Sequence, residues 1–168
     1  MKTISVQIFT ALILMFSSMG IAAPSTVVGQ PAPDFVLRST DGSNLRLSEY
    51  RSEVVVLSFW APWCGKCRDA MGYLNGLQQE HKSGGFAVLA VGVDGQSDKT
   101  QSFLADMAVS YPVMVDDDMR VVSREYEVGT LPLTLVIDRE GNIRYIHKGF
   151  KNGSSLQIAH EVAELLAE

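Results

Sequence analysis

The sequence predicts an α/β domain, with a mixed central β-sheet flanked by helices and an N-terminal β-hairpin. Three observations predict this class. Two continuous apolar runs, residues 54–59 and 86–93, fit strands that are buried on both faces of a sheet. A segment with helical periodicity joins them, as in a strand–helix–strand unit with parallel strands. A later pair of short strands around a tight turn must be antiparallel, so the sheet is expected to be mixed.

The N-terminal hairpin precedes the first buried strand. Residues 34–37 and 44–47 are short extended segments on either side of Asp41-Gly42, a dipeptide typical of hairpin turns. After the first buried strand, a helix is expected over residues 64–82. One face of this helix carries the apolar residues Cys67, Met71, Leu74 and Leu77.

The second half of the chain supplies the remaining elements. The pattern predicts a helix, a short extended piece, a short helix and two strands, over residues 97–110, 111–115, 119–126, 133–137 and 143–147. The last helix is expected to begin with the capping box Ser154-Ser155-Leu156-Gln157. Its predicted buried face consists of Leu156, Ala159, Ala163 and Leu166.

The first residues of the chain have the pattern of an export signal, not that of a folded segment. Lys2 supplies a positive start, residues 4–19 are mostly apolar, and Gly20-Ile21-Ala22 has the small-x-small pattern of a cleavage site. We therefore expect residues 1–22 to be a signal peptide and residues 23–168 to be the folded domain. The alternative is an uncleaved anchor, but polar and small residues shorten the apolar run below the roughly 20 residues of a spanning helix.

Composition narrows the classes of function. The chain has 168 residues and a net charge of −5, which becomes −6 without the single lysine of the leader. This length suits one domain with its own core. The sequence has no basic stripe with interleaved aromatic residues, so we do not expect nucleic acid as a partner. Cys64 and Cys67 are the only cysteines. A bridge that closes so short a loop adds only about 2 kcal/mol, so the pair is expected to perform chemistry.

The two cysteines lie in Trp63-Cys64-Gly65-Lys66-Cys67, where a buried strand leads directly into a helix. Cys64 falls at the helix N-terminus, where free N–H groups and the helix dipole favour a thiolate, the nucleophile in disulfide exchange. Cys67, one turn later, is expected to be the buried resolving thiol. C-x-x-C next to a βαβ pattern is a redox signature. We expect no metal and no cofactor besides this redox-active pair.

Three other uses of two cysteines fit less well. A zinc site needs about four ligands, and His81, His147 and His160 are scattered along the chain without a recognisable role. A peroxidase of the peroxiredoxin type would need Thr or Ser three residues before its cysteine, where this chain has Ala61. A copper carrier of the related metallochaperone type has three residues between its cysteines, not two.

Motifs beyond the cysteine pair resemble one branch of the thioredoxin superfamily. The matching stretches are Gly29-Gln30-Pro31-Ala32-Pro33-Asp34-Phe35, Leu47-Ser48-Glu49-Tyr50-Arg51, Phe59-Trp60-Ala61-Pro62-Trp63-Cys64, Tyr111-Pro112-Val113, Gly129-Thr130-Leu131-Pro132-Leu133-Thr134 and Ile137-Asp138-Arg139-Glu140-Gly141. They cover nearly all of residues 29–167. The chain is similar to the TlpA/ResA-like thiol–disulfide oxidoreductases, with a thioredoxin domain of the AhpC/TSA-redoxin type, a branch that includes periplasmic cytochrome c maturation reductases.

The resemblance implies a thioredoxin-like fold and a monomeric periplasmic enzyme that reduces protein disulfides with electrons from a membrane reductase. It also implies a cis peptide between Leu131 and Pro132, where the backbone before the proline pairs with the substrate chain. Trp63 is expected to be a partly exposed platform beside the nucleophile. Gly65 and Lys66 separate the cysteines, and a cation at Lys66 should favour the thiolate and make the pair more oxidising.

The chain departs from this family at positions that usually hold an acid. Thioredoxins proper keep a buried Asp where this chain has Ser58, and the TlpA/ResA branch often has Glu where it has Ala70. Asp69 or water is therefore left to accept the proton of Cys67. Asp116-Asp117-Asp118 lacks the spacing of a calcium loop and is expected to be a solvated turn.

Two other functions stay open. A disulfide oxidase or isomerase would suit the positive charge of Lys66. A redox-inactive thioredoxin-like binding module would suit the fold, but not the intact pair of Cys64 and Cys67.

Overall fold

The computed structural model describes residues 26–81, 83–116 and 121–168, so the expected leader lies outside the described residues. The strands are β1 (Val36–Arg38), β2 (Asn44–Arg46), β3 (Val54–Trp60), β4 (Phe86–Gly92), β5 (Val113–Val115), β6 (Leu133–Ile137) and β7 (Ile143–Lys148). The helices are the 3₁₀ turn η1 (Leu47–Tyr50), α1 (Gly65–Glu80), α2 (Asp98–Met107), α3 (Val121–Glu125) and α4 (Ser154–Ala167). Among these described helices, none is both long and apolar enough to span a membrane.

The central sheet has the strand order β5-β4-β3-β6-β7, and β1 pairs with β2 in a separate hairpin. β3 runs parallel to β4 and antiparallel to β6, β4 runs parallel to β5, and β6 and β7 form an antiparallel hairpin. The mixed sheet and the N-terminal hairpin are therefore confirmed. β3 lies in the middle, and all seven of its residues are buried, as its continuous apolar run predicts.

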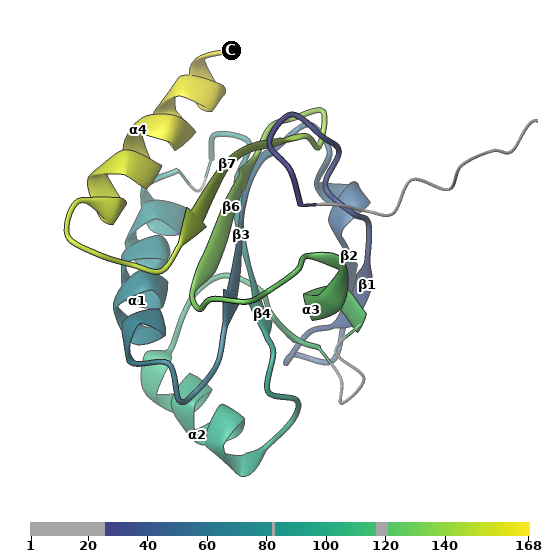
Figure 1. Ribbon diagram of the computed structural model, residues 1–168, viewed down its shortest axis with the longest axis vertical. Helices are drawn as coiled ribbons and strands as arrows, with labels where there is room; N and C mark the ends of the chain where they lie inside the picture. The colour runs from purple at the N-terminus through teal and green to yellow at the C-terminus, as the bar shows by residue number, and fades with distance from the viewer. Residues whose placement is uncertain (1–25, 82, 117–120) are drawn as a thin grey trace, which may run out of the picture.

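Helices cover both faces of the sheet (Figure 1). α1 and α4 lie along one face, and α3 and the β1–β2 hairpin lie on the other. Because successive side chains of a strand point to opposite faces, neighbours on β3 meet different helices. Phe59 packs against Tyr126, just after α3, with ring centroids 5.1 Å apart, whereas Trp60 stacks on Phe103 of α2 at 5.0 Å.

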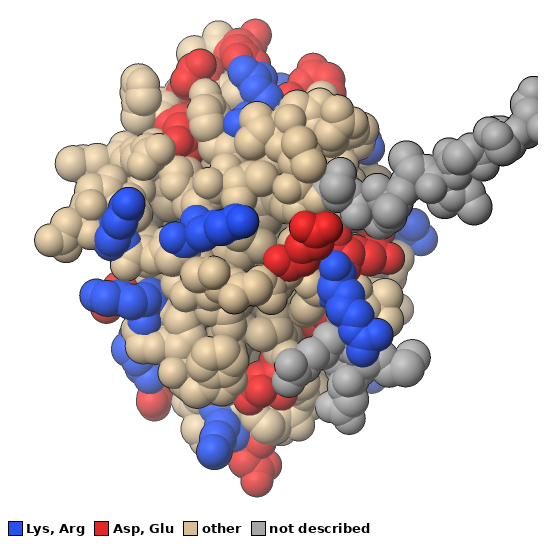
Figure 2. Space-filling model, in the orientation of Figure 1, with Lys and Arg blue, Asp and Glu red and all other residues tan. Residues whose placement is uncertain are grey.

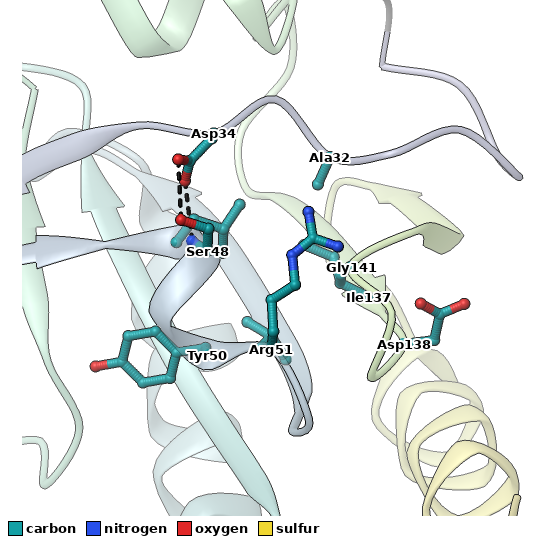
Figure 3. Close-up of a pocket in the computed structure, with 10 residues that line it drawn as sticks. Ala32, Asp34, Ser48, Tyr50, Arg51, Ile137, Asp138 and Gly141 are labelled. Atoms are coloured by element: carbon teal, nitrogen blue, oxygen red, sulfur yellow. Dashed lines mark hydrogen bonds between the residues drawn. The ribbon is translucent and has the colours of Figure 1, made fainter.

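The segment before β1 is tied to β2 and η1 by the side chain of Asp34 (Figure 3). Asp34 accepts hydrogen bonds from the backbone N–H and the hydroxyl of Ser48, at 2.9 and 3.0 Å, and pairs with Arg46. Burial raises the pKa of Asp34, but the bonds from Ser48 and Arg46 outweigh burial and hold that pKa below its ordinary value. The pocket beside them, with Arg51 in its wall, has an accessible volume of about 20 Å³, room for one water molecule.

The last helix begins at Ser154, as expected, but its predicted capping box and buried face are wrong. α4 follows Gly153, and its first hydroxyl, that of Ser154, accepts a bond from the backbone N–H of Lys151 at 3.0 Å instead of capping the helix. Leu156 is 77% exposed. The buried face consists of Ser154, Ile158, Glu161, Val162 and Leu165. Apolar residues occur on both sides of this helix, so periodicity alone does not decide which side meets the sheet.

The prediction of a solvated turn is also wrong for Asp116, while Asp117 and Asp118 lie outside the described residues. Asp116 is 1% exposed, and its Oδ2 accepts hydrogen bonds from the backbone N–H and the hydroxyl of Ser123, at 2.7 and 2.5 Å. Buried carboxylates need such donors, and this one ties the end of β5 to α3.

Candidate active site

β3 delivers the chain to the N-terminus of α1, where the two cysteines lie. Cys64 is the N-cap residue of α1, with extended backbone (φ −87°, ψ 100°), and no side chain caps the helix. The backbone N–H of Cys67 bonds to the carbonyl of Cys64 at 3.0 Å. This turn brings the two Cα atoms to 5.3 Å, and the sulfurs form a disulfide. The cysteines thus occupy the positions that the sequence predicts.

The two sulfur-bearing residues differ in their access to solvent. Cys64 is 8% exposed and lines a surface groove, whereas Cys67 is 0% exposed and faces the core on the buried side of α1. A disulfide in solution can therefore approach Cys64 but not Cys67. The unpaired N–H groups of the first turn of α1 point toward the Cys64 side, where a thiolate would develop.

The groove beside Cys64 has an accessible volume of about 450 Å³. It is lined by Trp63, Cys64, Gly65, Lys66, Val93, Val128, Gly129 and Leu131. Trp63 is 68% exposed, so its ring is available to a ligand. A second hollow of about 560 Å³ shares Val93, Val128 and Gly129 with the first and continues along α3 past Arg124 and Glu127.

The peptide bond between Leu131 and Pro132 is cis, as the resemblance implies. Leu131 lines the groove beside Cys64, whereas Pro132 is buried and is not among the residues that line it. The carbonyl of Pro132 accepts a hydrogen bond from the N–H of Gly149 at 2.8 Å, which places the end of β7 next to this proline. The structure therefore brings Trp63, Cys64 and Leu131 together around one groove.

Lys66 and Asp69 form an exposed pair at the start of α1. Their charged atoms are 3.3 Å apart, and the two side chains are 68% and 56% exposed. Asp69 is therefore turned to solvent and to Lys66, away from the buried Cys67. Ala70, where relatives often have Glu, is 1% exposed on the buried side of α1.

A buried polar row lies on the sheet face that α1 and α4 cover, and the sequence analysis did not find it. Ser58 of β3, Thr134 of β6 and His147 of β7 are register partners across the three strands, and the hydroxyls of Ser58 and Thr134 are 3.3 Å apart. His147 Nε2 lies 2.6 Å from Oε2 of Glu161, on α4. His147 therefore has a specific partner, and no local sequence signal links it to an acid fourteen residues away.

The described residues contain no group of three or more His, Cys, Asp or Glu side chains arranged to hold a metal ion. The described parts of the site are the cysteine pair, the exposed ring of Trp63 and a groove lined by both apolar side chains and Lys66.

Comparison with known proteins agrees with this geometry. Residues 28–146 match the AhpC/TSA family. The chain is 37% identical to the thiol-disulfide oxidoreductase ResA of Geobacillus kaustophilus over 125 residues, which cover 74% of this chain and 71% of that protein. It is 34% identical to ResA of Bacillus subtilis over 115 residues, covering 68% and 64%.

Solved structures show the same fold. A Chlorobium tepidum protein described as a thiol:disulfide interchange protein DsbE superposes with a TM-score of 0.78 at 33% identity, over 83% of this chain and 98% of that one. A Bacteroides thetaiotaomicron protein described as a protein disulfide isomerase has a TM-score of 0.78 at 29% identity, over 85% and 92%. The chain belongs to the AhpC/TSA family and is a ResA-like thiol–disulfide oxidoreductase of the thioredoxin superfamily.

Proposed function

We propose that this oxidoreductase reduces disulfides of exported proteins in the periplasm, with Cys64 as the nucleophile and Cys67 as the resolving thiol. The observation that carries the assignment is the asymmetry of the pair, because Cys64 lines the groove at the N-terminus of α1 while Cys67 is fully buried. Trp63, Leu131 and the backbone before Pro132 would hold the substrate chain beside Cys64.

The proposed reaction starts from the reduced dithiol. The thiolate of Cys64 attacks one sulfur of the substrate disulfide, and the other substrate sulfur leaves as a thiolate and takes a proton from solvent. Cys67 then loses its proton and attacks the sulfur of Cys64, so the second substrate sulfur leaves and is protonated. Two electrons have passed to the substrate, and the enzyme holds the Cys64–Cys67 disulfide seen in the structure.

Family membership and the N-terminal sequence support the location and direction of the reaction. Relatives bear the names ResA and DsbE, and residues 1–22 have the pattern of a leader that directs export. A membrane reductase would return two electrons by the reverse exchange, and apocytochrome c is one candidate substrate. We propose a monomer, because a nucleophile that lines an open groove needs no second subunit for access.

An oxidase or isomerase is the second candidate. The cation of Lys66 beside Cys64 favours the thiolate and hence the reduced form, which makes a pair more oxidising. The equilibrium redox potential against glutathione separates the two directions. A value near −270 mV, as in thioredoxin, would support the reductase, and a value near about −120 mV would support an oxidase.

The roles of the two cysteines are tested by trapping. Cys67→Ser should accumulate a mixed disulfide with a protein substrate such as insulin, because attack proceeds and resolution cannot. Cys64→Ser is the matched control and should trap nothing, since Cys67 is inaccessible. If the Cys64→Ser variant forms the mixed disulfide as readily, the assignment is wrong.

N-terminal sequencing of the exported protein tests cleavage after Ala22.

A further inference from the structure

Basic side chains gather beside the redox groove, although the whole chain has a net charge of −5. Figure 2 shows them over α1 and the loop that follows β7, around an area without charge, whereas acidic and basic side chains are mixed near α3. Lys66 lines the groove itself. Lys148 ends β7, and Lys151 lies in the loop between β7 and α4.

Strand register places Lys148 next to the groove. Lys148 is the register partner of Leu133, the first residue of β6. The following residue, Gly149, donates its N–H to the carbonyl of Pro132 at 2.8 Å, directly after Leu131 in the groove wall. The segment that carries Lys148 therefore lies next to the groove wall at Leu131.

The charges of Lys148 and Lys151 are not balanced nearby. Both residues are exposed, and neither forms an ion pair within the described parts of the chain. Other cations near this end of the sheet do have acidic partners. Lys66 pairs with Asp69 at 3.3 Å, and Arg68 pairs with an acid of α2 at 3.8 Å. Lys148 and Lys151 thus give the segment that follows β7 an unbalanced positive charge.

The end of the groove next to α3 carries charges of both signs. Its continuation along α3 is lined by Arg124 and Glu127, one charge of each sign. The stretch between the two ends is apolar, formed by Val93, Val128 and Leu131. An extended substrate segment that places its sulfur on Cys64 would therefore meet unbalanced positive charge near Lys148, and one charge of each sign near α3.

We propose that the basic edge formed by Lys148 and Lys151 recognises acidic side chains on the substrate polypeptide next to its disulfide. The proposal rests on the reductase function proposed above and narrows its substrate class. Opposite charge at an open groove raises the rate of productive encounter, and salt screens this attraction. An acidic segment would thus be held over Trp63 and Leu131 while its sulfur reaches Cys64.

The test compares three synthetic peptides with the same intramolecular disulfide, flanked by Glu, Ser or Lys pairs. The second-order rate constant for their reduction by the reduced enzyme is measured at low and high ionic strength, with 2-hydroxyethyl disulfide as a small neutral reference. We expect the Glu peptide to react on the order of tenfold faster than the Lys peptide at low salt. The difference should shrink near 1 M salt, where the Debye length is about 3 Å.

Charge reversal identifies the residues responsible. Lys148→Glu and Lys151→Glu should each reduce or invert the preference for the Glu peptide, without changing the rate with the neutral reference. Arg38→Glu, an exposed site on β1 with the same change in charge, is the matched control and should keep the preference.

Each of the following results would overturn the proposal. The peptides could react at equal rates at low salt, or Arg38→Glu could act as strongly as Lys148→Glu. The lysines could instead bind vesicles of anionic lipid while leaving the peptide rates unchanged, which would assign them to a membrane surface. If the neutral reference is reduced but no peptide is, the substrate class is wrong and the redox site stands. If nothing is reduced, the proposed function fails too.

Discussion

Truncation of Glu161 to Ala should destabilise the protein strongly, although the residue lies on the last helix, away from the cysteines. Its carboxylate lies 2.6 Å from His147 Nε2 and accepts a second hydrogen bond from Gln157 at 3.1 Å. The Glu161 and His147 side chains are only 6% and 10% exposed. Removal of one partner of a buried pair costs about 3–5 kcal/mol, because the other partner stays buried without its complement.

We expect a loss near the lower end, about 3 kcal/mol, because the change leaves the imidazole of His147 largely buried without its hydrogen-bond partner. For a domain of this size, about 2–4 °C of melting temperature is lost per kcal/mol, so the midpoint should fall by roughly 6–12 °C. The measurement is urea and thermal unfolding of the oxidised enzyme at neutral pH. Redox activity of the folded variant serves as an independent readout.

Two further variants make this test specific. Glu164→Ala removes an exposed carboxylate from the same helix, one that accepts a hydrogen bond from the Tyr145 hydroxyl at 2.9 Å, and should cost less than about 1 kcal/mol. Replacement of both His147 and Glu161 by Leu should recover most of the loss, because apolar residues can replace both partners of a buried hydrogen bond at little cost. Equal losses for Glu161→Ala and Glu164→Ala would refute the reasoning.

Four other substitutions probe the site and the fold. Lys66→Pro should lower the redox potential of the cysteine pair, by less than about 30 mV because this lysine is exposed and paired with Asp69. An unchanged redox potential would leave Lys66 without a redox role. Ala70→Glu should speed substrate release near pH 7, as measured by stopped-flow kinetics, because it supplies a base beside Cys67. Asp69→Asn should not slow this release. Equal release rates for Ala70→Glu and the wild type would contradict the prediction. Asp34→Asn should cost less than about 1 kcal/mol at pH 7, because the side chain is 40% exposed. The pKa of Asp34 lies below its ordinary value, so this loss should vanish as pH falls through the folded-state value; a loss independent of pH would refute the assignment.

The sequence by itself determined the elements whose signals are local. Continuous apolar runs identify β3 and β4, the Asp41-Gly42 dipeptide identifies the first hairpin, and the helix after Cys64 follows from apolar spacing. The position of the cysteines at a helix N-terminus was predictable for the same reason, since strand, turn and helix are consecutive. Such features depend on neighbours within a few residues, and those neighbours are visible in the sequence.

The tertiary structure decided what depends on segments far apart in the chain. Leu156 and Glu161 lie on the same helix, yet the sheet buries the acid and leaves the leucine exposed, because Glu161 meets His147 of β7. Likewise Lys148 borders the groove only because β7 pairs with β6. Periodicity describes how a helix or strand can face a core, but a partner on another element selects which face it uses. That selection requires the packed molecule, since the free energy of a buried charge depends on the groups that surround it.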